Sequence, residues 1–101
     1  MQIRQLEVFF AGMSTGSITS ASRLLNMTQP GASKIIQQLE RQLGFPLFSR
    51  TGGRLRPTPE ANAIFKEVQL LHAQFEKIQL LGRNLKKAKV SRVCVSVVRR
   101  D

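Results

Sequence analysis

A polar edge of amide, hydroxyl and ammonium groups lies along residues 28–43, at a spacing that would place it on one side of a helix. Its members are Gln29, Ser33, Lys34, Gln37 and Arg41. A glutamine amide can pair with N6 and N7 of adenine, and a lysine ammonium with O6 and N7 of guanine. Gln29 and Lys34 are therefore the best candidates for reading bases, whereas Gln37 could equally be only solvated.

Two helix starts separated by a tight break position this polar edge. Ser17 is a good N-cap for a short first helix, and Asn26 can adopt the left-handed conformation that ends it. Thr28 caps the second helix, with Pro30 in its first turn, where the missing N–H costs nothing. The expected buried residues are Ile18, Ala21, Leu24 and Leu25 in the first helix and Ala32, Ile36, Leu39 and Leu43 in the second. This pattern predicts a helix-turn-helix, whose second helix lies in the DNA major groove.

A further helix and a basic turn flank that motif. Apolar residues recur every three or four positions over 3–13, which predicts an amphipathic helix. A Gly-Gly pair between β-compatible residues predicts a hairpin or tight loop over 49–57. The arginines around this turn are Arg50, Arg54 and Arg56. A basic hairpin at this place is a wing whose arginines would reach the minor groove or its phosphates, with Arg54 best placed for insertion. Arg50 could instead form an ion pair with Glu40 or another helix carboxylate.

Residues 59–87 carry apolar side chains in a four–three alternation that is typical of a coiled-coil helix. The seam consists of Ile64, Val68, Leu71, Phe75, Ile78 and Leu85, and Gly82 fills the one position that is not apolar. The preceding domain is too small to cover a seam of this length, so its distal half needs another helix. We expect this helix to dimerise the chain, and an ordinary packed helix in a monomer is the alternative.

The balance of charge indicates the kind of partner. The 101 residues suffice for one small domain, and 42% of them are hydrophobic, which is enough for a modest core. Sixteen Lys and Arg against six Asp and Glu give a net charge of +10, which favours a polyanionic partner, first of all nucleic acid. An anionic membrane surface is disfavoured because the charge is spread over the wing and linker rather than along one helix face.

The sequence argues against catalysis and against a metal site. It holds no Ser-His-Asp set, no paired carboxylates and no phosphate-binding glycine loop. One histidine, His72, and one distant cysteine, Cys94, cannot build a metal site. A single cysteine forms no internal disulfide, which fits a reducing cytoplasm. Residues 88–101 are typical of a basic linker followed by one valine-rich strand with no partner strand, so we expect a further domain to begin there.

Several stretches, taken together, resemble one protein family. They are Leu6-Glu7-Val8-Phe9, Gly16-Ser17, Ala21 with Leu24, Thr28-Gln29-Pro30, Ser33-Lys34, Leu39-Glu40, Leu43-Gly44, Leu47-Phe48 and Arg50. They cover residues 1 to about 65 and resemble the N-terminal domain of the LysR-type transcriptional regulators, which are winged helix-turn-helix proteins. Ser22 departs from the family pattern, because a second alanine usually holds its position near the contact between the first two helices.

The resemblance implies a mainly α fold: a winged helix-turn-helix over 1–58, a linker and dimerisation helix over 59–87, and over 88–101 a basic linker with the first strand of an effector domain. It implies a cytoplasmic bacterial regulator, not an enzyme, that binds a specific site in double-stranded DNA as a homodimer and forms a tetramer when complete. The helix 28–43 would lie in the major groove and the wing 49–57 in the minor groove. No cofactor and no membrane contact are expected in this chain, since a small-molecule inducer would bind the effector domain.

The resemblance also implies a set of DNA contacts. The residues placed against bases are Gln29, Pro30, Ser33, Lys34 and Gln37. The residues placed against phosphates or the minor groove are Ser17, Thr19, Ser20, Ser22, Thr28, Arg50, Arg54 and Arg56. Ser17 could serve only as a cap, and Thr19 and Ser20 could be only solvated. The alternative function is an interaction module that pairs through its long helix with full-length regulators, without strong DNA binding of its own.

Overall fold

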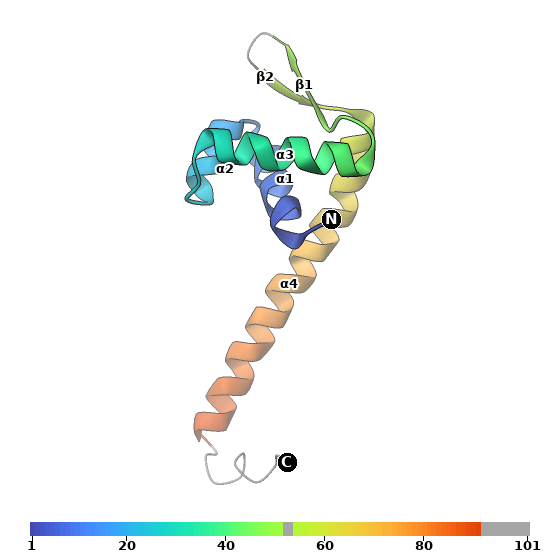
Figure 1. Ribbon diagram of the computed structural model, residues 1–101. Helices are drawn as coiled ribbons and strands as arrows, with labels where there is room; N and C mark the ends of the chain where they lie inside the picture. The colour runs from blue at the N-terminus through green and yellow to red at the C-terminus, as the bar shows by residue number, and fades with distance from the viewer. Residues whose placement is uncertain (52–53, 92–101) are drawn as a thin grey trace. The chain divides into compact units, whose positions relative to one another are not determined.

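The computed structural model describes residues 1–51 and 54–91, and for residues 50, 51, 54 and 89–91 only the backbone is described. The elements are α1 (Ile3–Thr15), α2 (Ile18–Leu24), α3 (Gln29–Leu43), β1 (Phe48–Thr51), β2 (Arg54–Pro57) and α4 (Pro59–Ser91). Figure 1 shows this order, with three short helices, a two-stranded hairpin and a long fourth helix. The expected fold class, a mainly α winged helix-turn-helix followed by a long helix, is confirmed.

The helix-turn-helix forms because each of its ends has a suitable residue. The Ser17 hydroxyl accepts the N–H of Ser20 at 3.1 Å and so caps α2. Asn26 follows α2 with a φ of 56°, the left-handed conformation that its short polar side chain tolerates. The Thr28 hydroxyl accepts the N–H of Gly31 at 3.1 Å and caps α3. The predicted break and both predicted caps are confirmed.

The core joins the three short helices to the first turns of α4. Its buried residues are Val8, Phe9, Ile18, Ala32, Ile36, Leu39, Leu47, Ala61 and Val68. Three of the residues expected to be buried differ, because Leu24 is exposed and Leu25 and Leu43 are only half-buried. Leu25 and Met27, the residues around Asn26, pack against the core and anchor the turn in place of Leu24.

Phenylalanine rings hold β1 and the start of α4 to the helices. The ring of Phe9 lies 5.8 Å from that of Phe48 and 6.2 Å from that of Phe65, centroid to centroid. Phe10 adds a second contact to Phe65 at 5.7 Å. Such tilted and edge-on pairs contribute beyond the burial of their area. Residues 1–69 therefore make up one compact unit.

The predicted hairpin forms, and its first strand begins one residue earlier than expected. β1 and β2 pair antiparallel, with Phe48 opposite Pro57 and Arg50 opposite Leu55. Phe48 can start the strand because its ring is anchored on Phe9. The two glycines predicted to form the turn lie outside the described residues.

A carboxylate and a hydroxyl fix the base of the hairpin. Oε2 of Glu40 accepts the N–H groups of Leu47 at 2.7 Å and Phe48 at 3.2 Å. The Thr58 hydroxyl donates to the carbonyl of Pro46 at 2.9 Å and accepts the N–H of Ala61 at 3.1 Å, which caps α4. The expected alternative of a pair between Glu40 and Arg50 concerns a side chain that is not described, and it stays a prediction.

The long helix extends further than the sequence indicated. α4 continues to Ser91, so the boundary expected at residue 87 is wrong and residues 88–91 are helical. Nothing in that stretch breaks a helix, and basic side chains near a helix C-terminus are favoured by the helix dipole. The strand expected after this point falls outside the described residues.

Removing the Glu40 carboxylate should destabilise the fold. Glu40→Ala leaves two N–H groups at the base of the hairpin without their acceptor, one of them belonging to the fully buried Leu47. We expect the free energy of unfolding in urea to fall by about 1–3 kcal/mol. Glu7→Ala is the matched control, because the Glu7 carboxylate only forms an exposed ion pair with Arg4 and should cost about 0.5 kcal/mol or less. Equal losses in the two variants would contradict the role given to Glu40.

Candidate nucleic-acid interface

The side chains predicted to read bases lie together on the N-terminal half of α3. Pro30, Lys34 and Gln37 are exposed, and Gln29 and Ser33 are half-buried. Ala32 and Ile36, on the opposite side of this half of α3, are buried in the core, so the polar edge faces outward as predicted. The helical spacing of the sequence is sufficient to place these groups on one surface.

Two of these residues bond to each other. Nε2 of Gln29 donates to Oγ of Ser33 at 3.0 Å, one helical turn further along α3. The bond uses one of the two N–H groups of the amide, so the second N–H and Oε1 can still pair with N7 and N6 of an adenine. Sequence reasoning treated the two side chains as separate contacts and missed this bond, although a spacing of four residues on a helix brings polar side chains within reach.

The hydroxyl cluster of α2 divides between solvent and core. Thr19 and Ser20 are exposed, and Ser17 is half-buried with its hydroxyl on the N–H of Ser20. Ser22 is only 3% exposed, and its hydroxyl donates to the carbonyl of Thr19 at 2.7 Å. The prediction of a phosphate contact at Ser22 is therefore wrong, because the side chain is buried and its hydroxyl hydrogen is already donated within α2. Thr28 remains exposed beside α3.

The hairpin carries the basic groups expected of it. Arg56 is exposed in β2, opposite Ser49 of β1. The backbones of Arg50 and Arg54 lie in β1 and β2, and the predictions for their side chains lie outside what the structure describes. Figure 1 shows the hairpin on one side of α3 and the N-terminal end of α1 on the other. The side of α3 that faces the hairpin is thus the side on which Arg50, Arg54 and Arg56 lie in the chain.

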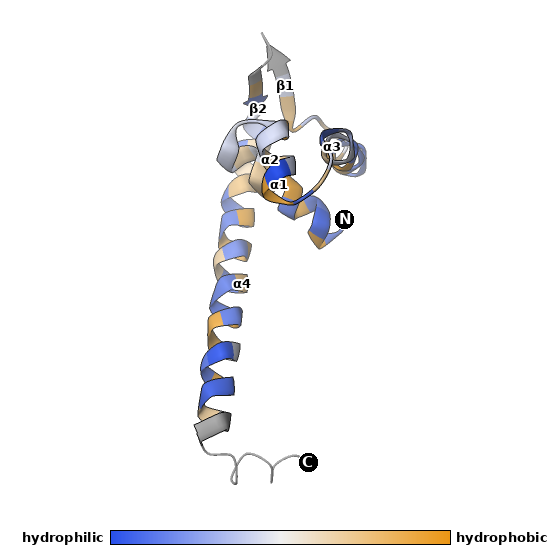
Figure 2. Cartoon of the chain, turned by 90° about the vertical axis from the view of Figure 1, so that its left-hand side faces the viewer, coloured by the Kyte–Doolittle hydropathy of each residue, from blue (hydrophilic) through white to orange (hydrophobic). Residues whose placement is uncertain are grey.

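The predicted coiled-coil seam divides into two parts. Val68 is only 6% exposed and Ile64 is half-buried, and both pack in the core of residues 1–69. The assignment of Val68 to a dimer interface is therefore wrong, since this part of α4 completes the domain's own core. The assignment of Ile64, which keeps part of its surface exposed, stays a prediction. Leu71, Phe75, Ile78 and Leu85 are 44% to 60% exposed, and the hydropathy colouring of Figure 2 shows apolar and polar residues alternating along this helix.

Other kinds of site find little support in the described part of the chain. No group of three or more His, Cys, Asp or Glu residues that could hold a metal ion occurs among residues 1–51 and 54–91. No helix in the same ranges is both long and apolar enough to cross a membrane. His72 pairs with Glu76 at 3.8 Å on the surface of α4.

Proteins of similar sequence are transcriptional regulators. The regulator DgcR of a Pseudoalteromonas species is 44% identical over 97 residues, which cover 96% of this chain and 33% of that protein. The regulatory protein NocR of Agrobacterium fabrum strain C58 is 48% identical over 88 residues, which cover 87% of this chain and 29% of that protein. The chain thus spans about a third of the length of these relatives.

The fold is similar to that of DNA-binding domains solved on DNA. The BenM DNA-binding domain in complex with catB site 1 DNA aligns with a TM-score of 0.78 and 28% identity, over 85% of this chain and 97% of that one. The CbnR DNA-binding domain in a DNA complex aligns with a TM-score of 0.67 and 25% identity, over 91% and 99% of the two chains. Residues 3–62 match the family model of the bacterial regulatory helix-turn-helix proteins of the lysR type. The chain therefore belongs to the LysR family of transcriptional regulators, and its helix-turn-helix is the DNA-binding domain of that family.

Proposed function

We propose that the chain binds a specific site in double-stranded DNA as a dimer, with α3 in the major groove and the hairpin in the minor groove. The observation that carries this proposal is the outward polar edge of α3, where Gln29 is bonded to Ser33 beside the exposed Lys34. The net charge of +10 supports it, because basic groups supply the affinity for a phosphate backbone. The similar BenM and CbnR domains, whose structures are DNA complexes, support it as well.

The contacts divide into those that select sequence and those that position the domain. Gln29, Ser33 and Lys34 would select bases, with Pro30 and Gln37 beside them in the groove. The exposed hydroxyls of Thr19, Ser20 and Thr28 would donate to phosphate oxygens, which fixes orientation without reading sequence. The Ser17 hydroxyl can cap α2 through its oxygen and donate its own hydrogen to a phosphate.

The exposed seam of α4 supports the dimer. Each of its four large side chains would contribute about 1.5–3 kcal/mol if a second helix buried it fully. A two-fold dimer presents two recognition helices, so the site would be roughly palindromic with half-sites about one helical turn of DNA apart, about 34 Å, or a multiple of it. Since the relatives are about three times longer, we further propose that an inducer-binding effector domain and tetramer formation belong to parts of the regulator outside these residues.

The base contacts can be tested by a double-mutant cycle on a site selected from random DNA. Gln29→Ala and Ser33→Ala should each reduce discrimination between the selected site and random DNA by about 1–3 kcal/mol. Their combined effect should be smaller than the sum, because Ser33 bonds the amide that reads the base. Lys34→Ala should lower discrimination independently, and Gln69→Ala on α4 is the control. Equal losses on both DNAs, measured by fluorescence anisotropy, would remove these residues as base readers.

The wing contact can be tested through the salt dependence of binding. Arg56→Ala should make the slope of log K against log salt shallower by about one, the contribution of one phosphate contact. Arg4→Ala removes the same charge from the N-terminal end of α1, on the other side of α3 from the hairpin, and should leave the slope unchanged. The same change of slope in both variants would show that only the overall charge matters. The salt dependence of an Arg54→Ala variant, measured in the same way, tests the predicted contact of Arg54 with the minor groove.

The dimer can be tested by placing charge on the seam. Leu71→Glu combined with Ile78→Glu should give a monomer in sedimentation velocity, because two carboxylates would face the partner helix at positions that are apolar now. Leu80→Glu is the matched control: Leu80 is also exposed, and nine residues after Leu71 it lies about half a turn round the helix. An unchanged mass in the double variant, or a monomer in the control, would rule out the seam as assigned.

A further inference from the structure

A buried glutamine without a full set of partners marks a second site on the domain. Gln5 of α1 is only 5% exposed, and its Oε1 accepts the N–H of Gln2 at 2.9 Å. No bond from its Nε2 occurs among the described residues. Its N–H groups are therefore available to an acceptor that can reach them.

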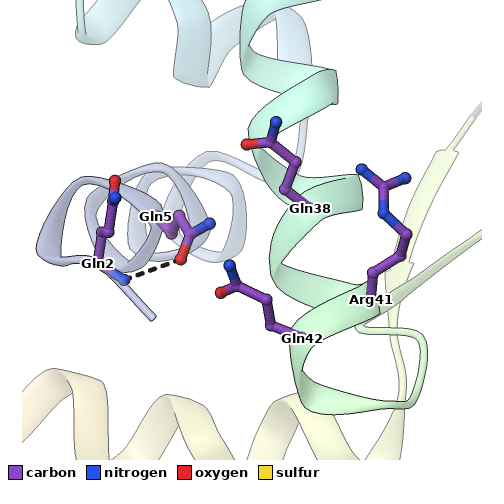
Figure 3. A pocket seen from close by; sticks show the side chains of 5 residues that line it. All are labelled: Gln2, Gln5, Gln38, Arg41 and Gln42. Carbon is purple, nitrogen blue, oxygen red and sulfur yellow. Dashed lines mark hydrogen bonds between the residues drawn. The ribbon is translucent and has the colours of Figure 1, made fainter.

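That amide points into an open cleft of about 380 Å³ between the N-terminal end of α1 and the C-terminal half of α3. The lining consists of Gln2, Gln5, Gln38, Arg41 and Gln42. Figure 3 shows the side-chain nitrogen of Gln5 directed toward Gln38 and Gln42, which extend from α3 toward α1, with Arg41 at the edge. All four amides can both donate and accept, and the one ionisable group is a cation.

The cleft does not coincide with the surface proposed for DNA. The residues proposed to read bases lie on the N-terminal half of α3, the part of a recognition helix that contacts base edges, whereas Gln38, Arg41 and Gln42 lie on its C-terminal half. Gln38 and Gln42 continue the row of Pro30 and Lys34, so the separation runs along the helix axis, about 12 Å from Lys34 to Gln42 at 1.5 Å per residue, and Arg41 is the one residue that the cleft shares with the polar edge. The end of α1 that forms the other wall lies across α3 from the hairpin in Figure 1. The cleft can therefore stay open when α3 and the hairpin hold DNA.

We propose that this cleft binds an extended acidic peptide segment of a partner protein while the domain is on DNA. Side-chain amides pair with the alternating N–H and C=O groups of an extended main chain, and a peptide carbonyl is the acceptor that Nε2 of Gln5 lacks. A carboxylate beside it would bind the guanidinium of Arg41, whose two-pronged geometry suits such a group. The absence of any acidic residue from the lining and the net charge of +10 favour a segment rich in Asp or Glu.

The test uses an acetylated and amidated peptide of alternating Glu and Ala as the probe. The isotope-labelled chain is titrated free and saturated with duplex DNA, and the side-chain amide signal of Gln5 is followed by NMR. We expect a saturable shift of that signal in both states, and about tenfold weaker binding of the matched Gln-Ala peptide, which keeps the main chain but lacks the charge. The signals of Lys34 and Gln37 report DNA binding separately, so a failure of the DNA proposal remains distinguishable.

Variants separate the cleft from the general positive charge. Gln42→Glu, at an exposed position that should not affect folding, places a like charge in the cleft and should weaken the Glu-Ala peptide about tenfold. Gln69→Glu makes the same change of charge at an exposed position of α4 and should have no such effect. No saturable shift at Gln5, a shift that disappears once DNA is bound, or equal weakening in the two variants would overturn the proposal.

Discussion

The domain depends on the bond between the Glu40 carboxylate and two consecutive N–H groups at the start of the hairpin. The chain reverses direction after Gly44, whose φ of 87° ends α3, and must then place Leu47 in the core and Phe48 against Phe9. A segment that turns this sharply cannot satisfy its N–H groups through a helix or sheet. One carboxylate from α3 satisfies two of them, so the same helix that carries the polar edge also fixes where the hairpin begins.

The local structure could be predicted from the sequence because its determinants are local. The caps at Ser17 and Thr28, the left-handed Asn26 and the hairpin all rest on residues within a few positions of one another. The bonds of Glu40 and of Thr58 to the segment before β1 span between seven and twelve residues and depend on how the chain packs. No periodicity encodes them, so sequence reasoning missed the Glu40 bonds.

The errors at the candidate site have the same origin. Ser22 and Val68 have the residue types and spacing expected of a contact surface, but neighbouring elements cover them. A seam defined by a four–three repeat does not reveal which of its turns the chain itself will bury, because that depends on the aromatic contacts that α1 makes with the start of α4. The outward orientation of the polar edge was predicted correctly, because the opposite side of α3 is apolar and leaves one orientation for the helix.

The division of α4 has a consequence for how the regulator can bind. Val68 closes the core, and the exposed apolar seam begins only three residues later at Leu71. The DNA-binding unit therefore buries its own apolar surface without a partner, and pairing through the distal helix need not be coupled to its folding. In the proposed dimer, pairing would act on affinity, because it would make the second half-site contact intramolecular. The gain would be set by the effective concentration of the second domain near its half-site. Each α3 could then make few base contacts, because both half-sites of a palindrome would contribute the same discrimination against other sequences.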